Sequence, residues 1–306
     1  MGIDMAGFFG LFDYNKPGKG VAKDEPKKPA PIHFLQLVVR KFFKLITLNL
    51  LYFVVLLPLI AVFLLYLFNI MQIKPEEIVS PLLTLIVMAA GSLPNIVNYL
   101  LLIVSAVLFG PATAAVSYIL RNYAREEHAW LWYDFKTKAK ENFRQAFCVG
   151  VIDLVVCASF LFYLSSAAQG VEGPFQVLSY LAFPIIFVYI IMRFYIYTVI
   201  VTFNISLFNA FKNSLIFFVL GLGRNLIALI GSAAILFLCS FLDIVLVPLF
   251  AFTFSGFLIS FCTWPVIKKY MIDKVQLQNN DTSTEDAQDE TAALAEGDPD
   301  ENRSDD

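Results

Sequence analysis

Long apolar runs alternate with short charged segments from about residue 45 to residue 265. A helix needs about 20 mostly apolar residues to cross the hydrocarbon core of a bilayer, because each residue advances it by about 1.5 Å. The pattern therefore predicts an all-α, polytopic bundle of six membrane spans. We expect the spans at residues 45–68, 96–120, 146–167, 177–201 and 226–242, with a sixth that follows Asp243 and ends near Pro265.

Two shorter segments interrupt this alternation. Residues 32–44 have the apolar spacing of a helix and are expected to run along or into the inner leaflet. Residues 78–94 are apolar but short, and a Gly-Ser-Leu-Pro sequence ends them at Pro94. We interpret them as a surface or re-entrant helix on the outer side. The alternative is a true span, which would invert the topology of everything downstream.

Two polar and aromatic stretches join the predicted spans on the inner side. In residues 121–145, apolar side chains recur every four positions from Leu131 to Phe143, whereas the lysines between them face elsewhere. This spacing is typical of an amphipathic helix, which we place along the inner membrane surface. Residues 202–225 form a second inner stretch, rich in Asn and Phe. We expect either helices that cover the inner rim of the bundle or a surface for a partner protein, with candidate residues Trp130, Phe135, Phe143, Phe211 and Lys212.

Lys and Arg residues fall almost entirely on one side of this topology. Of the 22 in the chain, 20 lie in the predicted inner segments, Lys74 lies outside, and Arg193 lies within a span. Lys and Arg collect on the cytoplasmic side of membrane proteins. The distribution therefore predicts a multi-pass protein with both termini in the cytoplasm.

Composition divides the chain into three parts. Hydrophobic residues make up 58% of the chain and charged ones 15%, against about 25% charged residues in a soluble domain. We expect a cytoplasmic segment with a basic, Pro-rich linker at 1–31, a membrane domain at 32–275, and a disordered acidic tail at 276–306. The lipid bilayer is the expected partner. Nucleic acid is not, because the basic residues flank the spans instead of forming one stripe.

The chain offers few residues for catalysis. It holds two histidines, His33 and His128, and no phosphate-binding loop, dinucleotide fingerprint or H-E-x-x-H zinc motif. Its four cysteines lie in apolar runs without C-x-x-C spacing, which is typical of small core residues rather than metal ligands or disulfides. We therefore expect no enzymatic activity, no metal and no cofactor.

One pair of charges is expected inside the membrane. Asp153 lies about eight residues into the third span and Arg193 about eight residues before the inner end of the fourth, so both lie roughly 12 Å deep. An unpaired charge at that depth is costly. We therefore predict an ion pair, which serves either as a polar site or gate or as a structural link. The alternative is that Arg193 extends its charge to the inner surface on its own.

A kinked run of small residues lies in the second span. It comprises Gly110, Pro111, Ala112, Ala114 and Ala115. Small side chains let two helix backbones approach closely, and proline frees a backbone carbonyl inside the membrane. We favour helix packing as the role of this run over contact with a substrate.

Four short sequence motifs occur together in this chain. They are Phe9-Gly10-Leu11-Phe12-Asp13-Tyr14, Asn49-Leu50-Leu51-Tyr52 with Leu57-Pro58, Phe109-Gly110-Pro111-Ala112-Thr113-Ala114-Ala115 and Glu141-Asn142-Phe143-Arg144-Gln145-Ala146. Together they resemble the bacterial YesL-like membrane proteins, a family of unknown function. Pro58 and Gly110 are about fifty residues apart, farther than in the family pattern, which predicts an insertion. The resemblance implies a bacterial cell-membrane protein with an accessory role in carbohydrate uptake and subunits of a sugar importer as partners.

Three classes of function remain open from the sequence. An accessory or scaffold protein is favoured by the small number of charges within the spans. A transporter or permease-like subunit is favoured if the helices enclose a polar site between the third and fourth spans. A membrane enzyme is the least supported class, because the candidate catalytic residues are so few.

Overall fold

The computed structural model describes residues 29–71, 81–92, 94–168, 174–242 and 250–274. Within these ranges the regular structure is helical and includes no strand. The elements are α1 (Ala30–Met71), α2 (Pro81–Ser92), α3 (Asn95–Ala124), α4 (Leu131–Glu141), α5 (Phe143–Ala168), α6 (Pro174–Thr202), α7 (Leu207–Leu220), α8 (Leu222–Leu242), α9 (Phe252–Ile267) and a π-helical turn at Lys268–Asp273. The expected N-terminal linker and acidic tail lie almost wholly outside the described residues.

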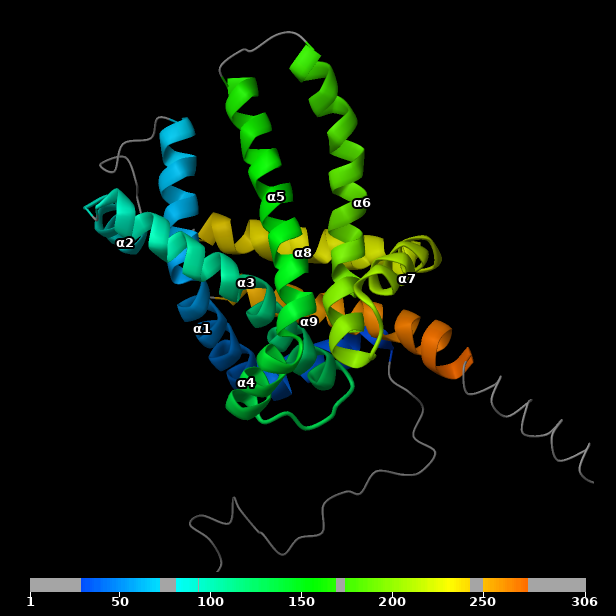
Figure 1. The fold of residues 1–306 in the computed structure, drawn as a ribbon. Coiled ribbons are helices and arrows are strands. Elements are labelled where there is room, and N and C mark those ends of the chain that lie inside the picture. The colour runs from blue at the N-terminus through cyan, green and yellow to red at the C-terminus, as the bar shows by residue number, and fades with distance from the viewer. Residues whose placement is uncertain (1–28, 72–80, 93, 169–173, 243–249, 275–306) are drawn as a thin grey trace, which may run out of the picture.

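Five of the described helices are long and apolar enough to cross a membrane. Their apolar segments are Ala30–Leu65, Tyr99–Ala124, Phe143–Tyr163, Phe183–Thr202 and Leu222–Leu242. The predicted class, a polytopic helical membrane protein, is confirmed. Figure 1 shows α5 and α6 side by side, with their upper ends above the other labelled helices in this view. α8 runs roughly crosswise to both.

The first expected span and the segment before it form one continuous helix. α1 runs for 42 residues and keeps Pro58 inside it. No glycine or proline separates residues 32–44 from the apolar run, so nothing in the sequence ends the helix between them. α2, by contrast, has 12 residues and a length of about 18 Å, which is too short for a hydrocarbon core of about 30 Å. The interpretation of this segment as a non-spanning helix is therefore favoured by its length.

α9 stands where the sixth span was expected, lies centrally among the other helices, and continues without a break into the π-helical turn at Lys268–Asp273. It has 16 residues and packs against α1, α3, α6 and α8. Phe257, Thr253 and Ile267 on this helix are fully buried. A helix that is apolar on all sides is typical of a protein core as well as of a lipid-facing span. The backbone N–H of Thr253 donates to Asn49 Oδ1 at 3.0 Å and so ties α9 to α1.

Arg121 joins the ends of three helices and is buried despite its charge. It lies near the end of α3 and donates to Asn122 Oδ1 and, at 2.6 Å, to Thr202 Oγ1 at the end of α6. Its Cζ lies 4.6 Å from the ring centroid of Tyr118 and 5.9 Å from that of Trp264 on α9. No described carboxylate forms an ion pair with it. Hydrogen bonds and contacts with aromatic ring faces therefore offset the desolvation cost of burying this cation.

The backbones of α3 and α5 touch where two glycines face each other. A Cβ placed on Gly110 would lie 2.0 Å from the carbonyl oxygen of Ala146, and one on Gly150 would lie 2.8 Å from Cα of Gly110. Both positions therefore require the absence of a side chain. This close approach sets the distance between α3 and α5.

Substitution of Gly110 by Ala tests this contact. The added methyl group meets backbone rather than a flexible side chain, so we expect Gly110→Ala to destabilise the protein by about 1–3 kcal/mol or more. Gly223→Ala is the matched control, because nothing lies within 4 Å of a Cβ there. Thermal unfolding in detergent should show a lowered midpoint for Gly110→Ala only. Equal midpoints for the two variants would contradict the assignment.

A charged contact joins the N-terminal part of α1 to Glu126, which lies in the turn after α3, outside the apolar segments. Glu126, which has φ 62° in the turn after α3, accepts a hydrogen bond from Arg40. Its Oε1 lies 3.3 Å from Nε2 of His33. The hydrogen bond from Arg40 is the main reason that the pKa of the Glu126 carboxyl lies below its usual value, and the nearby charges of Arg40 and His33 lower it further.

This contact predicts a pH-dependent contribution to stability. Because the folded pKa of Glu126 is lowered, the contribution is present above the unfolded pKa of about 4.3 and is lost as the pH falls through the folded pKa. Its size is about 0.2–1 kcal/mol, since the side chain is exposed. Glu126→Gln should therefore unfold at a lower temperature than the wild type at neutral pH, with the difference vanishing in acid. A difference independent of pH would argue against the contact.

Candidate functional site

Asp153 and Arg193 form an ion pair between α5 and α6. Arg193 Nε donates to Asp153 Oδ1 at 2.9 Å. The two helices run antiparallel, and both residues lie about three turns from the helix ends near Phe143 and Thr202. The carboxylate is almost completely buried, with 6% of its side chain exposed, whereas 35% of the Arg193 side chain is exposed. The pair is therefore held within the helix pair rather than by Arg193 reaching toward the surface.

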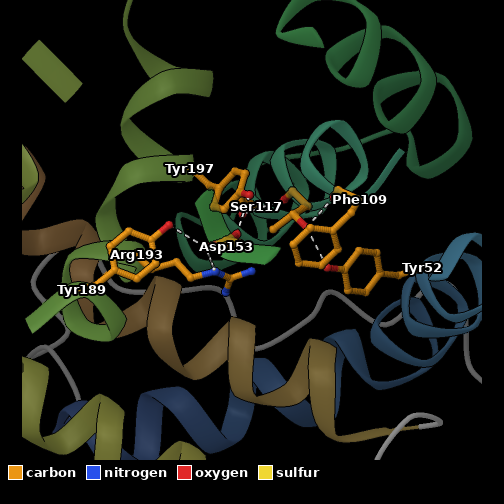
Figure 2. A network of polar contacts seen from close by, with 8 residues as sticks. Tyr52, Phe109, Ser117, Asp153, Tyr189, Arg193 and Tyr197 are labelled. Carbon is orange, nitrogen blue, oxygen red and sulfur yellow. Dashed lines mark hydrogen bonds and ion pairs between the residues drawn. The ribbon is translucent and has the colours of Figure 1, made fainter. Parts of the chain in front are cut away.

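Two tyrosines complete the surroundings of the carboxylate. Tyr189 donates its hydroxyl to Asp153 Oδ1 and Tyr197 donates to Oδ2, each at 2.7 Å (Figure 2). Tyr189, Arg193 and Tyr197 follow one another at four-residue intervals on α6, which brings them to one face of the helix. One face of α6 therefore supplies three donors to a single carboxylate on α5.

A second set of hydroxyl groups lies next to the ion pair. Thr113 Oγ1 donates to the carbonyl oxygen of Phe109 at 2.7 Å, so the Tyr52 hydroxyl, 2.7 Å from Thr113 Oγ1, must be the donor in that contact. Ser117 donates to the carbonyl oxygen of Thr113 at 2.8 Å. Figure 2 shows Phe109 and Tyr52 on the side of the Arg193 guanidinium group. The centroid of the Phe109 ring lies 6.0 Å from Arg193 Cζ.

The ion pair lies at the boundary between two hollows. A partly open hollow of about 420 Å³, called the interior cavity below, is lined by residues of α1, α3, α5, α6, α8 and α9, including Tyr52, Thr113 and Ser255. A groove of about 490 Å³ runs between α5 and α6 and is lined by Phe160, Phe183 and other apolar residues. Asp153 and Arg193 line both hollows.

The small-residue run of α3 lies in the helix contacts. Gly110, Pro111, Ala112, Ala114 and Ala115 are all buried. None of them lines the interior cavity, whereas Thr113, within the same run, does. The contacts around these five residues are therefore those of helix packing.

The predicted partner surface does not form as one face. Trp130 is 70% exposed, and Phe143 and Lys212 are exposed. Phe135, however, is buried in a core cluster with residues of α1 and α3, so its inclusion in an exposed surface was wrong. α4 ends at Glu141, so Phe143 belongs to α5 and does not continue the apolar face of α4. Phe211 is half-buried against a second core cluster.

The described residues include no group of three His, Cys, Asp or Glu side chains that could hold a metal ion. The four cysteines are free, and the expectation that all of them are core residues was wrong. Only Cys262 is buried, because hydropathy does not distinguish a lipid-facing position from a packed one. Cys157 instead lines both hollows at the ion pair.

Sequence reasoning identified Asp153 and Arg193 but missed their partners. The four-residue spacing of Tyr189, Arg193 and Tyr197 was a readable signal, because it places three donors on one face of a helix. Tyr52 and Ser255 could not be found in this way. They are far apart in the chain, and only the packing of α1 and α9 brings them to the same cavity.

Comparison with known proteins adds one partial match. Residues 45–164 match a family model described as "Protein of unknown function, DUF624". The matched region includes α3 and Asp153 but ends before α6 and Arg193. No curated protein and no solved structure matches the chain. The narrower YesL-like resemblance stays a prediction.

A mutant cycle tests the energetic coupling of the ion pair. Asp153→Asn leaves Arg193 without its counterion, and Arg193→Gln leaves a buried carboxylate, so we expect each to cost about 3–5 kcal/mol. The double variant leaves no unpaired charge and should be more stable than either single variant. Thermal unfolding of the four proteins measures this. Strictly additive losses would contradict the pairing.

Proposed function

We propose that this protein binds a small solute inside the membrane domain, at Asp153 and Arg193, as a transporter-like or permease-like subunit. The observation that carries the proposal is the position of the ion pair at the wall of a cavity of about 420 Å³. Ligand cavities are typically about 300–1,000 Å³, mostly apolar, and hold a few convergent polar groups. This cavity has mostly apolar walls and gathers Tyr52, Thr113 and Ser255 near the pair.

Charged residues within membrane spans favour this reading over that of a pure scaffold. They are rare, costly and most often functional. A scaffold needs only packed helices, and apolar residues would join α5 to α6 at lower cost than a desolvated ion pair. The proposal is one of binding and passage and involves no catalysis.

The proposal places the protein in a bacterial cell membrane with both termini in the cytoplasm. The concentration of 20 of the 22 Lys and Arg residues in the expected inner segments supports this orientation. An accessory role in carbohydrate uptake, with importer subunits as partners, stays a prediction of the resemblance. No described residue of the cavity singles out a sugar from other solutes.

The native thiol of Cys157 offers a test of solute access. Cys157 lines both hollows, whereas Cys239 on α8 is not among the lining residues of either. We compare two variants that each keep one of these two cysteines and have the other three cysteines of the chain replaced, treated in membrane vesicles with a water-soluble methanethiosulfonate reagent. Cys157 should react faster than Cys239, because the thiolate forms only where water reaches the sulfur. Equal, slow labelling of both would overturn the proposed solute site.

A further inference from the structure

Most N–H groups of Arg193 make no hydrogen bond to a residue that the structure describes. A guanidinium group carries five N–H donors, and only the one on Nε donates to Asp153. The two terminal nitrogens, with four N–H groups, make no hydrogen bond to any residue that the structure describes. Figure 2 shows them pointing toward Phe109 and Tyr52, both of which line the interior cavity. An arginine inside a membrane domain thus presents most of its donors to a cavity.

Asp153 has no need of these additional donors. Its two oxygens already accept hydrogen bonds from Tyr189, Tyr197 and Arg193 Nε. The tyrosine hydroxyls share in stabilising the carboxylate charge, which leaves the far edge of the guanidinium group available for a second anion. Asp153 therefore fixes the orientation of Arg193 without using its terminal nitrogens.

The other oxygen-bearing side chains of the lining carry hydroxyl groups. The Tyr52 hydroxyl is a donor to Thr113, whose own proton goes to the carbonyl oxygen of Phe109. Ser255, on α9, lines the same cavity with a buried hydroxyl that has no partner among the described residues. The terminal nitrogens of Arg193 therefore remain the donors on this lining for which the described residues supply no acceptor.

The apolar lining of the interior cavity indicates which other chemical groups a ligand must contain. Apart from these polar groups, the interior cavity is lined mainly by apolar side chains, among them Leu56, Ile60, Phe63 and Leu154. A fully hydrated inorganic anion would lose its water to apolar walls without compensation. A ligand that fits must carry both an oxyanion and an apolar body.

We propose that the terminal nitrogens of Arg193 bind the carboxylate or phosphate of an amphiphilic anion whose apolar part occupies the interior cavity. The inference rests on the proposed function and names the ligand class of that site. Arginine suits the role because its planar fork matches two oxygens of a carboxylate or phosphate. The same head group is found on free amphiphilic acids and on anionic lipids.

The test uses the full-length protein in nanodiscs of zwitterionic phosphatidylcholine. The probes are dodecanoate, dodecyl phosphate and the neutral dodecanol, which share one chain and differ in the head group. Hydrogen bonds in which one partner is charged are stronger than neutral ones, so we expect at least one anionic probe to bind about tenfold or more tightly than dodecanol. Equal affinity for dodecanol and both anions would overturn the inference.

Two variants test whether the preference for anionic probes depends on Arg193. Asp153→Asn with Arg193→Gln removes both charges, is expected to fold, and should lose the preference for the anions while still binding dodecanol. Arg224→Gln, at an exposed position on α8, is the matched control and should bind like the wild type. Retention of the anion preference in the double variant would contradict the role of Arg193.

Two further readouts separate the outcomes. If Cys157 reacts with the methanethiosulfonate reagent but no anion is preferred, the solute site stands and the ligand class is wrong. If Cys157 is unreactive and no probe binds, both proposals fail. Repeating the titration in nanodiscs that contain phosphatidylglycerol distinguishes an anionic lipid from a free amphiphilic acid as the ligand. If the site binds the lipid, phosphatidylglycerol competes and weakens dodecanoate binding in the wild type but not in the double variant. If the site binds free acids, the affinity for dodecanoate is unchanged.

Discussion

A carboxylate within a membrane domain must be surrounded by donors, and the arrangement of the central helices meets this requirement at Asp153. Three donors come from one face of α6, where Tyr189, Arg193 and Tyr197 are spaced by four residues. The pair requires α5 and α6 to be adjacent and antiparallel. The contact of Gly110 with Gly150, one turn before Asp153, brings α3 against α5 and places Phe109 near the guanidinium group. Helix packing and charge neutralisation therefore depend on each other.

The same arrangement explains why the ion pair borders a cavity. α9 lies among α1, α3, α6 and α8 and contributes Ser255 and Ser260 to the lining. Asn49 on α1 accepts a hydrogen bond from the backbone N–H of Thr253 in the first turn of α9 and so fixes this helix beside the cavity. A polar site of limited size inside apolar walls is the consequence. The proposed binding role rests on this combination.

Hydropathy predicted most of the helices and the positions of both charged residues along them, because apolar run length and the position along a helix are local properties. It did not predict that α1 is a single helix or that α9 is a central helix, since lipid-facing and protein-buried segments have the same composition. The burial of Arg121 was missed for a related reason. Its partners Thr202 and Trp264 are distant in sequence and meet only through packing.

The arrangement of these helices depends on the ion pair between Asp153 and Arg193, in which the same carboxylate also binds the hydroxyl groups of Tyr189 and Tyr197. Infrared spectroscopy of the protein in nanodiscs at neutral pH, compared with Asp153→Asn, measures directly whether Asp153 carries the charge of this pair. We expect the wild type to lack the carbonyl stretching band of a protonated carboxylic acid assignable to Asp153. Such a band, present in the wild type and lost in the variant, would contradict it.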